Sequence, residues 1–158
     1  VWSTEHGSMG GDELNLIKPG ANYGWPRVTH AVEYGREGRP ITPHRSLPGM
    51  EDPKVAWVPG IAPGGIAIYR GDYYPGWDGD LFASGLRVNG RPNSGTLLRV
   101  DLDGDAVQGQ ERIELGAVRV RDIEQGPDAR LYVLVTDTEN YRDRGQRNGR
   151  LVRLEPVR

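Results

Sequence analysis

The chain has 158 residues, enough for one domain with a hydrophobic core, but 36% hydrophobic residues, 23 glycines and 12 prolines favour short strands and turns over helices. A net charge of −2 provides no basic surface for phosphates, which argues against a nucleic-acid partner. The chain has no cysteine, which excludes disulfides and thiolate metal sites, and no apolar run is long enough to span a membrane.

Short runs with the composition and alternation of β-strands follow one another along the chain, separated by turn residues. In chain order these runs are residues 1–4, 13–17, 65–70, 80–84, 96–102, 112–115, 118–124, 131–136 and 150–154. No window of helical length carries a regular 3.6-residue period. The pattern predicts an all-β chain.

A polar, glycine-rich stretch, Glu5–Asp12, separates the first two predicted strands. Its glycines at positions 7, 10 and 11 allow backbone carbonyls to turn into a cavity, because glycine adopts backbone conformations that other residues avoid. Carbonyl oxygens are good ligands for a hard cation such as calcium. The stretch is therefore a candidate cation site.

The segment Asn22–Trp57 is long, irregular and rich in glycine, proline and charge, so it is either a binding loop or a flexible insertion. Within it, His30 and His44 are expected to be exposed loop residues. Further along, Asp101–Asp105 resembles the start of a calcium-binding loop, but Arg112 stands where such a loop needs a glutamate. We interpret that stretch as a polar hairpin turn.

Arg119 and Arg121 alternate with Val120 in a predicted strand, which would place both guanidinium groups on one face. Two arginine forks on one face suit an anion rich in carboxylates. A solvated face paired with Asp122 or Glu124 explains the pattern equally well. The residues alone leave these two interpretations open.

Pairs of strands recur in a fixed order. The runs at 79–84 and 95–102 resemble those at 129–134 and 149–155, and a partial copy covers 1–4 and 12–17. A repeat of about 50 residues with about four short strands is typical of a β-propeller blade. We therefore expect about two and a half blades: a partial blade over 1–56 and blades over about 57–116 and 117–158. A small β-sandwich with internal similarity is the alternative.

Six separated motifs, in consistent order, carry a family resemblance. They are Thr4–Gly7, Gly10–Asn15, Pro19–Pro26, Trp57–Pro63, Gly71–Trp77 and Arg119–Asp122. Together they resemble the PQQ-dependent aldose sugar dehydrogenases, also called the glucose/sorbosone dehydrogenase family. The resemblance implies a six-bladed β-propeller, of which this sequence resembles the C-terminal half. The family's catalytic-base histidine falls before the matched region, so no catalytic residue is expected in this chain.

The resemblance also implies two calcium sites. At the first, calcium would be bound by the backbone carbonyls of Gly7 and Ser8, although Ser8 stands where the family usually has proline. The second, structural site would use Glu13 and Tyr23. The alternative for Glu13 is a simple ion pair with a neighbouring arginine.

By the same resemblance, PQQ would contact His6 and be gripped by Arg119 and Arg121. Arg87 falls where the family commonly has a lysine near the quinone oxygens, and Trp57 would line the sugar entrance. These five residues are the expected cofactor-binding set.

The implied reaction is oxidation of an aldose at its anomeric carbon to the lactone, with an electron acceptor as a further partner. The chain would supply cofactor and calcium contacts, the base would come from a missing N-terminal half or a second copy, and the chain alone would be inactive. The family also implies a periplasmic or secreted location. The alternatives are a non-catalytic propeller, or a self-associating half-propeller that acts as a binding module.

Overall fold

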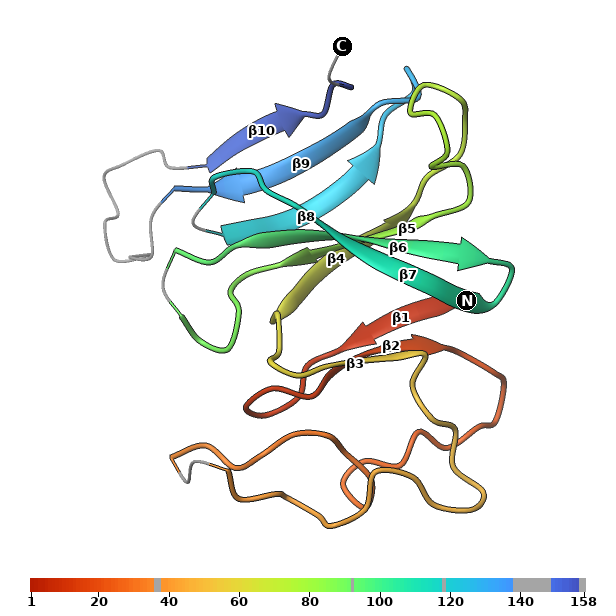
Figure 1. Cartoon of the computed structure of the whole chain (residues 1–158), viewed down its shortest axis with the longest axis vertical. Helices are drawn as coiled ribbons and strands as arrows, with labels where there is room; N and C mark the ends of the chain where they lie inside the picture. Colours follow the sequence, from red (N-terminus) through yellow and green to blue (C-terminus); the bar gives the residue numbers. More distant parts are fainter. Residues whose placement is uncertain (36–37, 92, 118, 138–148, 157–158) are drawn as a thin grey trace. The chain divides into compact units, whose positions relative to one another are not determined.

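The computed structural model describes residues 1–35, 38–91, 93–117, 119–137 and 149–156. All secondary-structure elements assigned within these residues are β-strands. The described part of the chain therefore contains no helix that could cross a membrane. The strands form three sheets (Figure 1). The prediction of an all-β chain is confirmed.

The chain divides into two compact units, Val1–Pro63 and Gly64–Arg158. The sheet of the first unit has the order β1-β2-β3, where the strands are β1 (Trp2–Glu5), β2 (Asp12–Leu16) and β3 (Val55–Trp57). β1 and β2 are antiparallel, and their register sets Glu5 directly opposite Glu13. β3 was not predicted, because three residues are too few to show a period.

The long segment between β2 and β3 has no strand or helix assigned in its described residues, but it is internally bonded. Thr42 Oγ1 donates to the carbonyl of Arg27 at 2.9 Å, and Arg45 Nη1 donates to the carbonyls of Thr29 at 2.6 Å and Thr42 at 2.9 Å. Thr29 and Thr42 are buried. These contacts argue against the interpretation of a loose insertion.

The prediction that both loop histidines are exposed is correct for His44 and wrong for His30, which is half buried. The backbone at His30 packs against Gly11, where a β-carbon would lie 2.6 Å from the His30 carbonyl carbon. Burial, and then the positive charge of Arg45, lower the pKa of His30. The close approach depends on a residue 19 positions away, so local composition could not show it.

The second unit contains two sheets, of order β4-β5-β6-β7 and β10-β9-β8. Their strands are β4 (Pro63–Ile68), β5 (Leu81–Gly85), β6 (Thr96–Asp103), β7 (Ala106–Ile113), β8 (Arg119–Gln125), β9 (Leu131–Thr136) and β10 (Gly149–Arg153). β4 begins at the last residue of the first unit. Val118, the first residue of the predicted run 118–124, lies outside the described residues.

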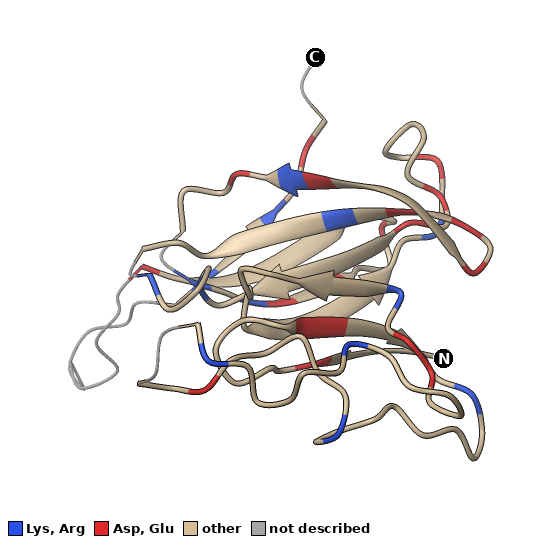
Figure 2. Cartoon of the chain, turned by 60° about the horizontal axis from the view of Figure 1, so that its bottom comes forward, with Lys and Arg blue, Asp and Glu red and all other residues tan. Residues whose placement is uncertain are grey.

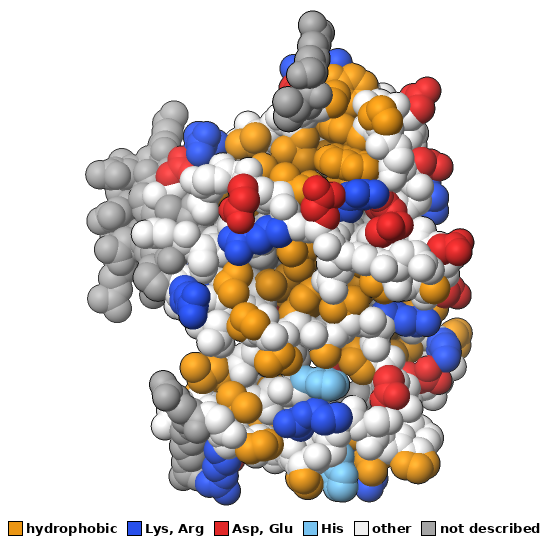
Figure 3. Space-filling view, viewed as in Figure 1, with side chains coloured by type: hydrophobic (Ala, Val, Ile, Leu, Met, Phe, Trp, Pro, Cys, Tyr) orange, Lys and Arg blue, Asp and Glu red, His pale blue; other side chains and the backbone are white. Residues whose placement is uncertain are grey.

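The core of the second unit joins residues from both of its sheets and from the loop between β4 and β5. Its buried members are Tyr69, Tyr74, Phe82, Leu97, Ala117, Val120, Ile123, Leu131, Val133 and Val135. On β9, alternate residues point into this core, as expected for a strand with one buried face. Near the C-terminal end of β10, hydrophobic side chains remain at the surface in Figure 3, and Tyr74, Trp77 and Leu154 line a hollow of about 410 Å³ there.

β7 is longer and begins earlier than the predicted run 112–115. Its residues are mostly exposed and polar, so they lack the hydrophobic signal of a core strand. Asp103 pairs with Ala106 across the turn between β6 and β7. The interpretation of Asp101–Asp105 as a hairpin turn is therefore confirmed.

Candidate functional site

The loop between β1 and β2 is a tightly folded glycine turn. A β-carbon at Gly7 would overlap the carbonyl oxygen of Gly10, and Gly10 and Gly11 both have left-handed φ values, of 72° and 69°. Met9 exchanges backbone hydrogen bonds with Val32, which ties the loop to the segment after β2. The glycines are therefore needed for both space and conformation.

Asp12 holds this turn in place. Its Oδ1 accepts the N–H of Gly7 at 2.7 Å and its Oδ2 accepts the N–H of Ala62 at 2.6 Å, while the side chain itself is buried. Gly60 packs directly on this carboxylate, because a β-carbon there would lie 2.7 Å from Oδ2. Of the two adjacent acids, Asp12 and Glu13, Asp12 thus uses both of its side-chain oxygens to accept backbone N–H groups.

His6 projects from the same turn and is exposed. Its Nε2 lies 2.7 Å from the carbonyl oxygen of Pro63 and must donate, since a carbonyl only accepts. In the neutral ring, Nδ1 is then the acceptor. His6 can therefore meet a ligand through Nδ1 or through the face of its ring.

The carbonyl oxygens of Gly7 and Ser8 meet the chemical requirement for calcium ligands. Neither accepts a hydrogen bond from any residue that the structure describes. Hard oxygen donors of this kind suit calcium, which tolerates neutral carbonyls when other oxygens complete its shell. Because the ligand is the backbone, the serine at position 8 does not remove it.

His6, Gly7, Glu13 and Tyr23, four of the predicted site residues, line one pocket of about 440 Å³ in the first unit. The full lining is Glu5, His6, Gly7, Gly11, Glu13, Tyr23, Trp25, Val28 and Thr29. Trp25 is a strongly exposed aromatic residue, at 59%. The pocket therefore combines carboxylates, backbone groups and an accessible indole.

Two carboxylates face each other in this pocket. Glu5 and Glu13 are direct cross-strand partners, and such partners lie on the same face of a sheet. Burial raises the pKa of Glu13, opposed by a hydrogen bond of 3.3 Å from Asn15 Nδ2 and reinforced by the charge of Glu5. A bound cation would stabilise both charges.

The oxygen atoms near Glu13 fit such a cation. The side-chain oxygen of the fully buried Asn15 has no hydrogen-bond partner among the described residues. Tyr23 is fixed at the end of β2, because its hydroxyl donates to the Leu16 carbonyl at 3.0 Å and accepts the Lys18 N–H at 2.7 Å. Glu13 makes no ion pair with any arginine that the structure describes.

The predicted arginine pair lies on β8 in the second unit, and both side chains are half buried. Val120 is buried between the two arginines, as the predicted alternation requires. The pairing shifts at Arg121, because Val120 pairs with Val135 and Asp122 with Leu134, so Arg121 is an extra residue in a β-bulge. Guanidinium forks suit an anion with several carboxylates.

The remaining predicted cofactor residues, Arg87 and Trp57, are less available to a ligand. Arg87 follows β5, and its Nη1 donates to the carbonyl of Gly90 at 3.3 Å within its own loop. Trp57, at the end of β3, is only 6% exposed and offers little side-chain surface to a sugar. Their proposed roles remain predictions.

Basic and acidic residues are interspersed along the described part of the chain, as Figure 2 shows. Within those residues, no group of three or more histidine, aspartate or glutamate side chains is arranged to hold a metal. A cation in the first unit would therefore depend on one or two carboxylates together with neutral oxygens.

Comparison with known proteins gives the family. The model of the glucose/sorbosone dehydrogenase family matches residues 1–152. The chain belongs to this family. Among its relatives, Synechocystis protein slr1608, an uncharacterized protein, is 48% identical over 98% of the chain. The aldose sugar dehydrogenase YliI of Escherichia coli is 32% identical over 99% of it.

Solved structures of glucose/sorbosone dehydrogenase relatives share the fold. A crystal structure of a glucose dehydrogenase has a TM-score of 0.79 at 35% identity, with 99% of this chain and 41% of that chain covered. The PQQ-bound form of the Streptomyces coelicolor aldose sugar dehydrogenase has a TM-score of 0.63 at 28% identity, with 98% and 39% covered. The chain spans 34% of slr1608 and 38% of YliI. The prediction of part of a β-propeller is confirmed.

Sequence reasoning missed several residues of this candidate site. Glu5, Trp25 and Thr29 line the pocket, and Asp12 accepts the N–H of the lining residue Gly7. The pairing of Glu5 with Glu13 could have been found by counting back from the glycine turn in an antiparallel register. The places of Trp25 and Thr29 depend on the irregular segment, which carries no period.

Proposed function

We propose that the complete propeller containing this chain is a PQQ- and calcium-dependent dehydrogenase that oxidises aldose sugars at C1 to the lactone. The single observation that carries the proposal is the β1–β2 turn, where the exposed His6 is followed by Gly7 and Ser8, whose carbonyls accept no hydrogen bond from the described residues. Relatives described as aldose sugar and glucose dehydrogenases, one of them PQQ-bound, support the assignment. We also propose that the three sheets are blades of one propeller, near residues 1–56, 57–116 and 117–158.

PQQ, when bound, supplies the two-electron oxidant for the sugar, and calcium supplies a Lewis acid. In this proposal Arg119 and Arg121 bind the carboxylates and quinone oxygens of the cofactor, with Arg87 as a further cationic contact. His6 contacts the cofactor through Nδ1 or its ring, because Nε2 is bonded to Pro63. Trp57 is assigned to the sugar entrance.

A second calcium ion would have a structural role at Glu13 and Tyr23. The cross-strand position of Glu5 supports this assignment, as does the side-chain oxygen of Asn15, which has no hydrogen-bond partner among the described residues. Removing the charge repulsion between Glu5 and Glu13 would stabilise the end of the β1–β2 ladder.

No residue of this chain is assigned as the base that takes the proton from the sugar C1 hydroxyl. The base, and the rest of the funnel wall, would come from the part of the propeller outside this chain or from a second copy. An electron acceptor completes the reaction, and by family resemblance we propose a periplasmic or secreted location.

The test is a titration of the complete propeller assembly with PQQ, followed by the cofactor's absorbance, in calcium and in excess chelator. We expect binding only with calcium. The carbonyls of Gly7 and Ser8 carry no net charge, so they need the cation to bind the anionic cofactor. Arg121→Ala should weaken binding by about 10- to 100-fold, since hydrogen bonds to charged groups contribute roughly 1.5–3 kcal/mol. The matched control is Arg112→Ala, which removes an exposed arginine of β7. Equal PQQ affinity in chelator would contradict the calcium assignment.

A further inference from the structure

The bulge at Arg121 sits where β8 approaches its neighbours unusually closely. A β-carbon at Gly64 would overlap the carbonyl oxygen of Arg121, and one at Gly65 would overlap Asp122 Oδ1. A β-carbon at Gly95 would lie 2.7 Å from Arg119 Cα. None of these glycines has a left-handed φ, so what they provide is space.

A buried hydroxyl fixes the glycine side of this contact. Ser84 on β5 is fully buried, and its Oγ both accepts the N–H of Gly65 at 2.8 Å and donates to the Gly65 carbonyl at 3.1 Å. The same Oγ would lie 2.7 Å from a β-carbon at Gly64. This hydroxyl therefore fixes the distance between the start of β4 and β5. It thereby also fixes the position of Gly64, against which the Arg121 carbonyl packs.

Asp122 fixes the β8 side of this contact between β4 and β8. Its Oδ1 accepts the N–H of Ile123 at 2.9 Å, a local bond immediately after the bulge, and it packs against Gly65. Regular pairing resumes at Asp122 opposite Leu134. Such a bond supports the irregular backbone where a ladder partner for Arg121 is missing.

We propose that Gly64, Gly65, Ser84 and Asp122 form a seat that positions the bulged Arg121 for its contact with the anionic quinone cofactor. The proposal rests on the proposed function of Arg121 as a PQQ ligand. A guanidinium group can make two parallel hydrogen bonds to an anion only when the backbone that carries it is held in place. A displacement near 1 Å can weaken the effect of such a positioned group about 100-fold. The four seat residues act through Arg121 and are positioning residues.

The first experiment measures PQQ affinity of the complete propeller assembly with calcium for Ser84→Ala and Gly65→Ala. We expect the Kd to rise about 10-fold or more in each, because a positioned ion contact is lost by small displacements. The matched control is Gly109→Ala on β7, where a β-carbon meets nothing within 4 Å and φ is not left-handed. Ser84→Ala removes only one oxygen, so it keeps the test valid if Gly65→Ala fails to fold.

The second measurement separates positioning from general destabilisation. In an Arg121→Ala background, Ser84→Ala should change the Kd less than about twofold, because residues that act through one group are not additive. Asp122→Asn keeps an acceptor for the Ile123 N–H and should retain near-normal affinity, whereas Asp122→Ala should not. If Ser84→Ala raised the Kd in the Arg121→Ala background as much as it does in the wild-type background, the proposal would be overturned.

A readout without cofactor distinguishes this inference from the proposed function. In the cofactor-free protein, Ser84→Ala should shift the NMR amide signals of Arg121 and Asp122, while Gly109→Ala should leave them unchanged. If the wild-type assembly fails to bind PQQ, the proposed function is wrong, and the seat is still judged by these signals. Unchanged Arg121 and Asp122 signals in Ser84→Ala would overturn the seat itself.

Discussion

Two adjacent acids at the start of β2, Asp12 and Glu13, have different tasks because their surroundings differ. Both oxygens of Asp12 accept backbone N–H groups, whereas Glu13 faces a pocket opposite a second carboxylate. The sequence predicted that this stretch is special and that Glu13 is a candidate ligand. It could not assign Asp12, because one of its partners, Ala62, is fifty residues away.

Asp12→Ala should destabilise the protein by about 2–4 kcal/mol, because two backbone donors then lose a charged acceptor in a buried place. The matched control is Asp105→Ala, at an exposed turn position, which should change stability by less than about 0.5 kcal/mol. Urea denaturation followed by circular dichroism measures both. Equal midpoints for the two variants would show that Asp12 does not hold the turn.

His30 should give the protein an acid-sensitive step in stability. Its pKa is lowered by burial and then by the charge of Arg45, so the folded protein binds the proton less readily than the unfolded chain. Stability is therefore retained above the ordinary histidine pKa and lost as pH falls below it toward the lowered value.

The measurement for His30 is the melting temperature between pH 7.5 and 5.0. We expect His30→Gln to flatten this part of the curve, while His44→Gln, at an exposed position, should leave its slope unchanged. The same slope in wild type and His30→Gln would refute the assignment.

At the scale of elements, strands with a buried face could be predicted and irregular features could not. The run predicted at 131–136 coincides with β9, whose alternation against the core is strong. β7 was mostly missed because it is exposed, and β3 because it is short. The bulge in β8 lies against Gly64 and Gly65 of β4, a long-range contact that no pattern within β8 could reveal.

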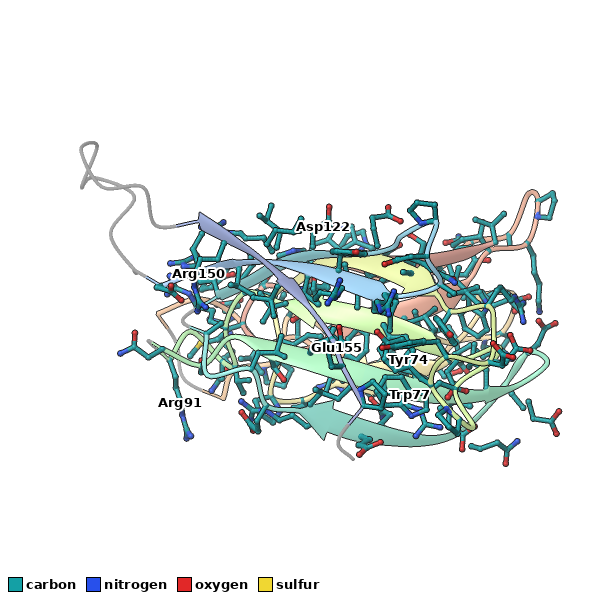
Figure 4. All side chains as sticks on the ribbon, turned by 90° about the horizontal axis from the view of Figure 1, so that it is seen from above. Tyr74, Trp77, Arg91, Asp122, Arg150 and Glu155 are labelled. Atoms are coloured by element: carbon teal, nitrogen blue, oxygen red, sulfur yellow. The ribbon has the colours of Figure 1, made fainter. Side chains whose placement is uncertain are left out.

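Tyr74 joins three elements of the second unit. From the loop between β4 and β5, its hydroxyl donates to the carbonyl of Leu154 at 2.9 Å and accepts the N–H of Leu131 at 3.0 Å. Its ring stacks on Trp77 with centroids 4.8 Å apart, and Figure 4 shows both close to Glu155. Burial raises the pKa of Tyr74.

Tyr74→Phe should cost about 1–3 kcal/mol in unfolding free energy, because the buried N–H of Leu131 and the partly buried carbonyl of Leu154 lose their partner while the ring remains. Tyr73→Phe is the matched control, since its hydroxyl bonds to the exposed Glu155 and should contribute less. Chemical denaturation compares the two. A larger loss for Tyr73→Phe would contradict the role of Tyr74 as the joint.

At the scale of the whole molecule, the 50-residue repeat predicted the fold class, and the motif order predicted the family that the comparison confirms. What the repeat could not supply is the cofactor site as a whole. Its expected residues divide between the two units, with His6 and the calcium carbonyls in one and the arginines in the other. Local periodicity carries no information on such long-range placement.

The last prediction is that the 158-residue chain, expressed alone, does not oxidise aldoses. No residue here is assigned as the base, whose loss typically costs about 10²- to 10⁴-fold, and the chain spans 34–41% of slr1608, YliI and the glucose dehydrogenase structure. Among the described residues, β1 and β10 lie at the edges of their sheets, where strands can pair with another chain. Glucose, PQQ, calcium and a dye acceptor test turnover, with YliI as the positive control and light scattering to establish the oligomeric state. Turnover by a verified monomer would show that the chain contains its own base, and a search of its carboxylates and histidines by substitution would then identify it.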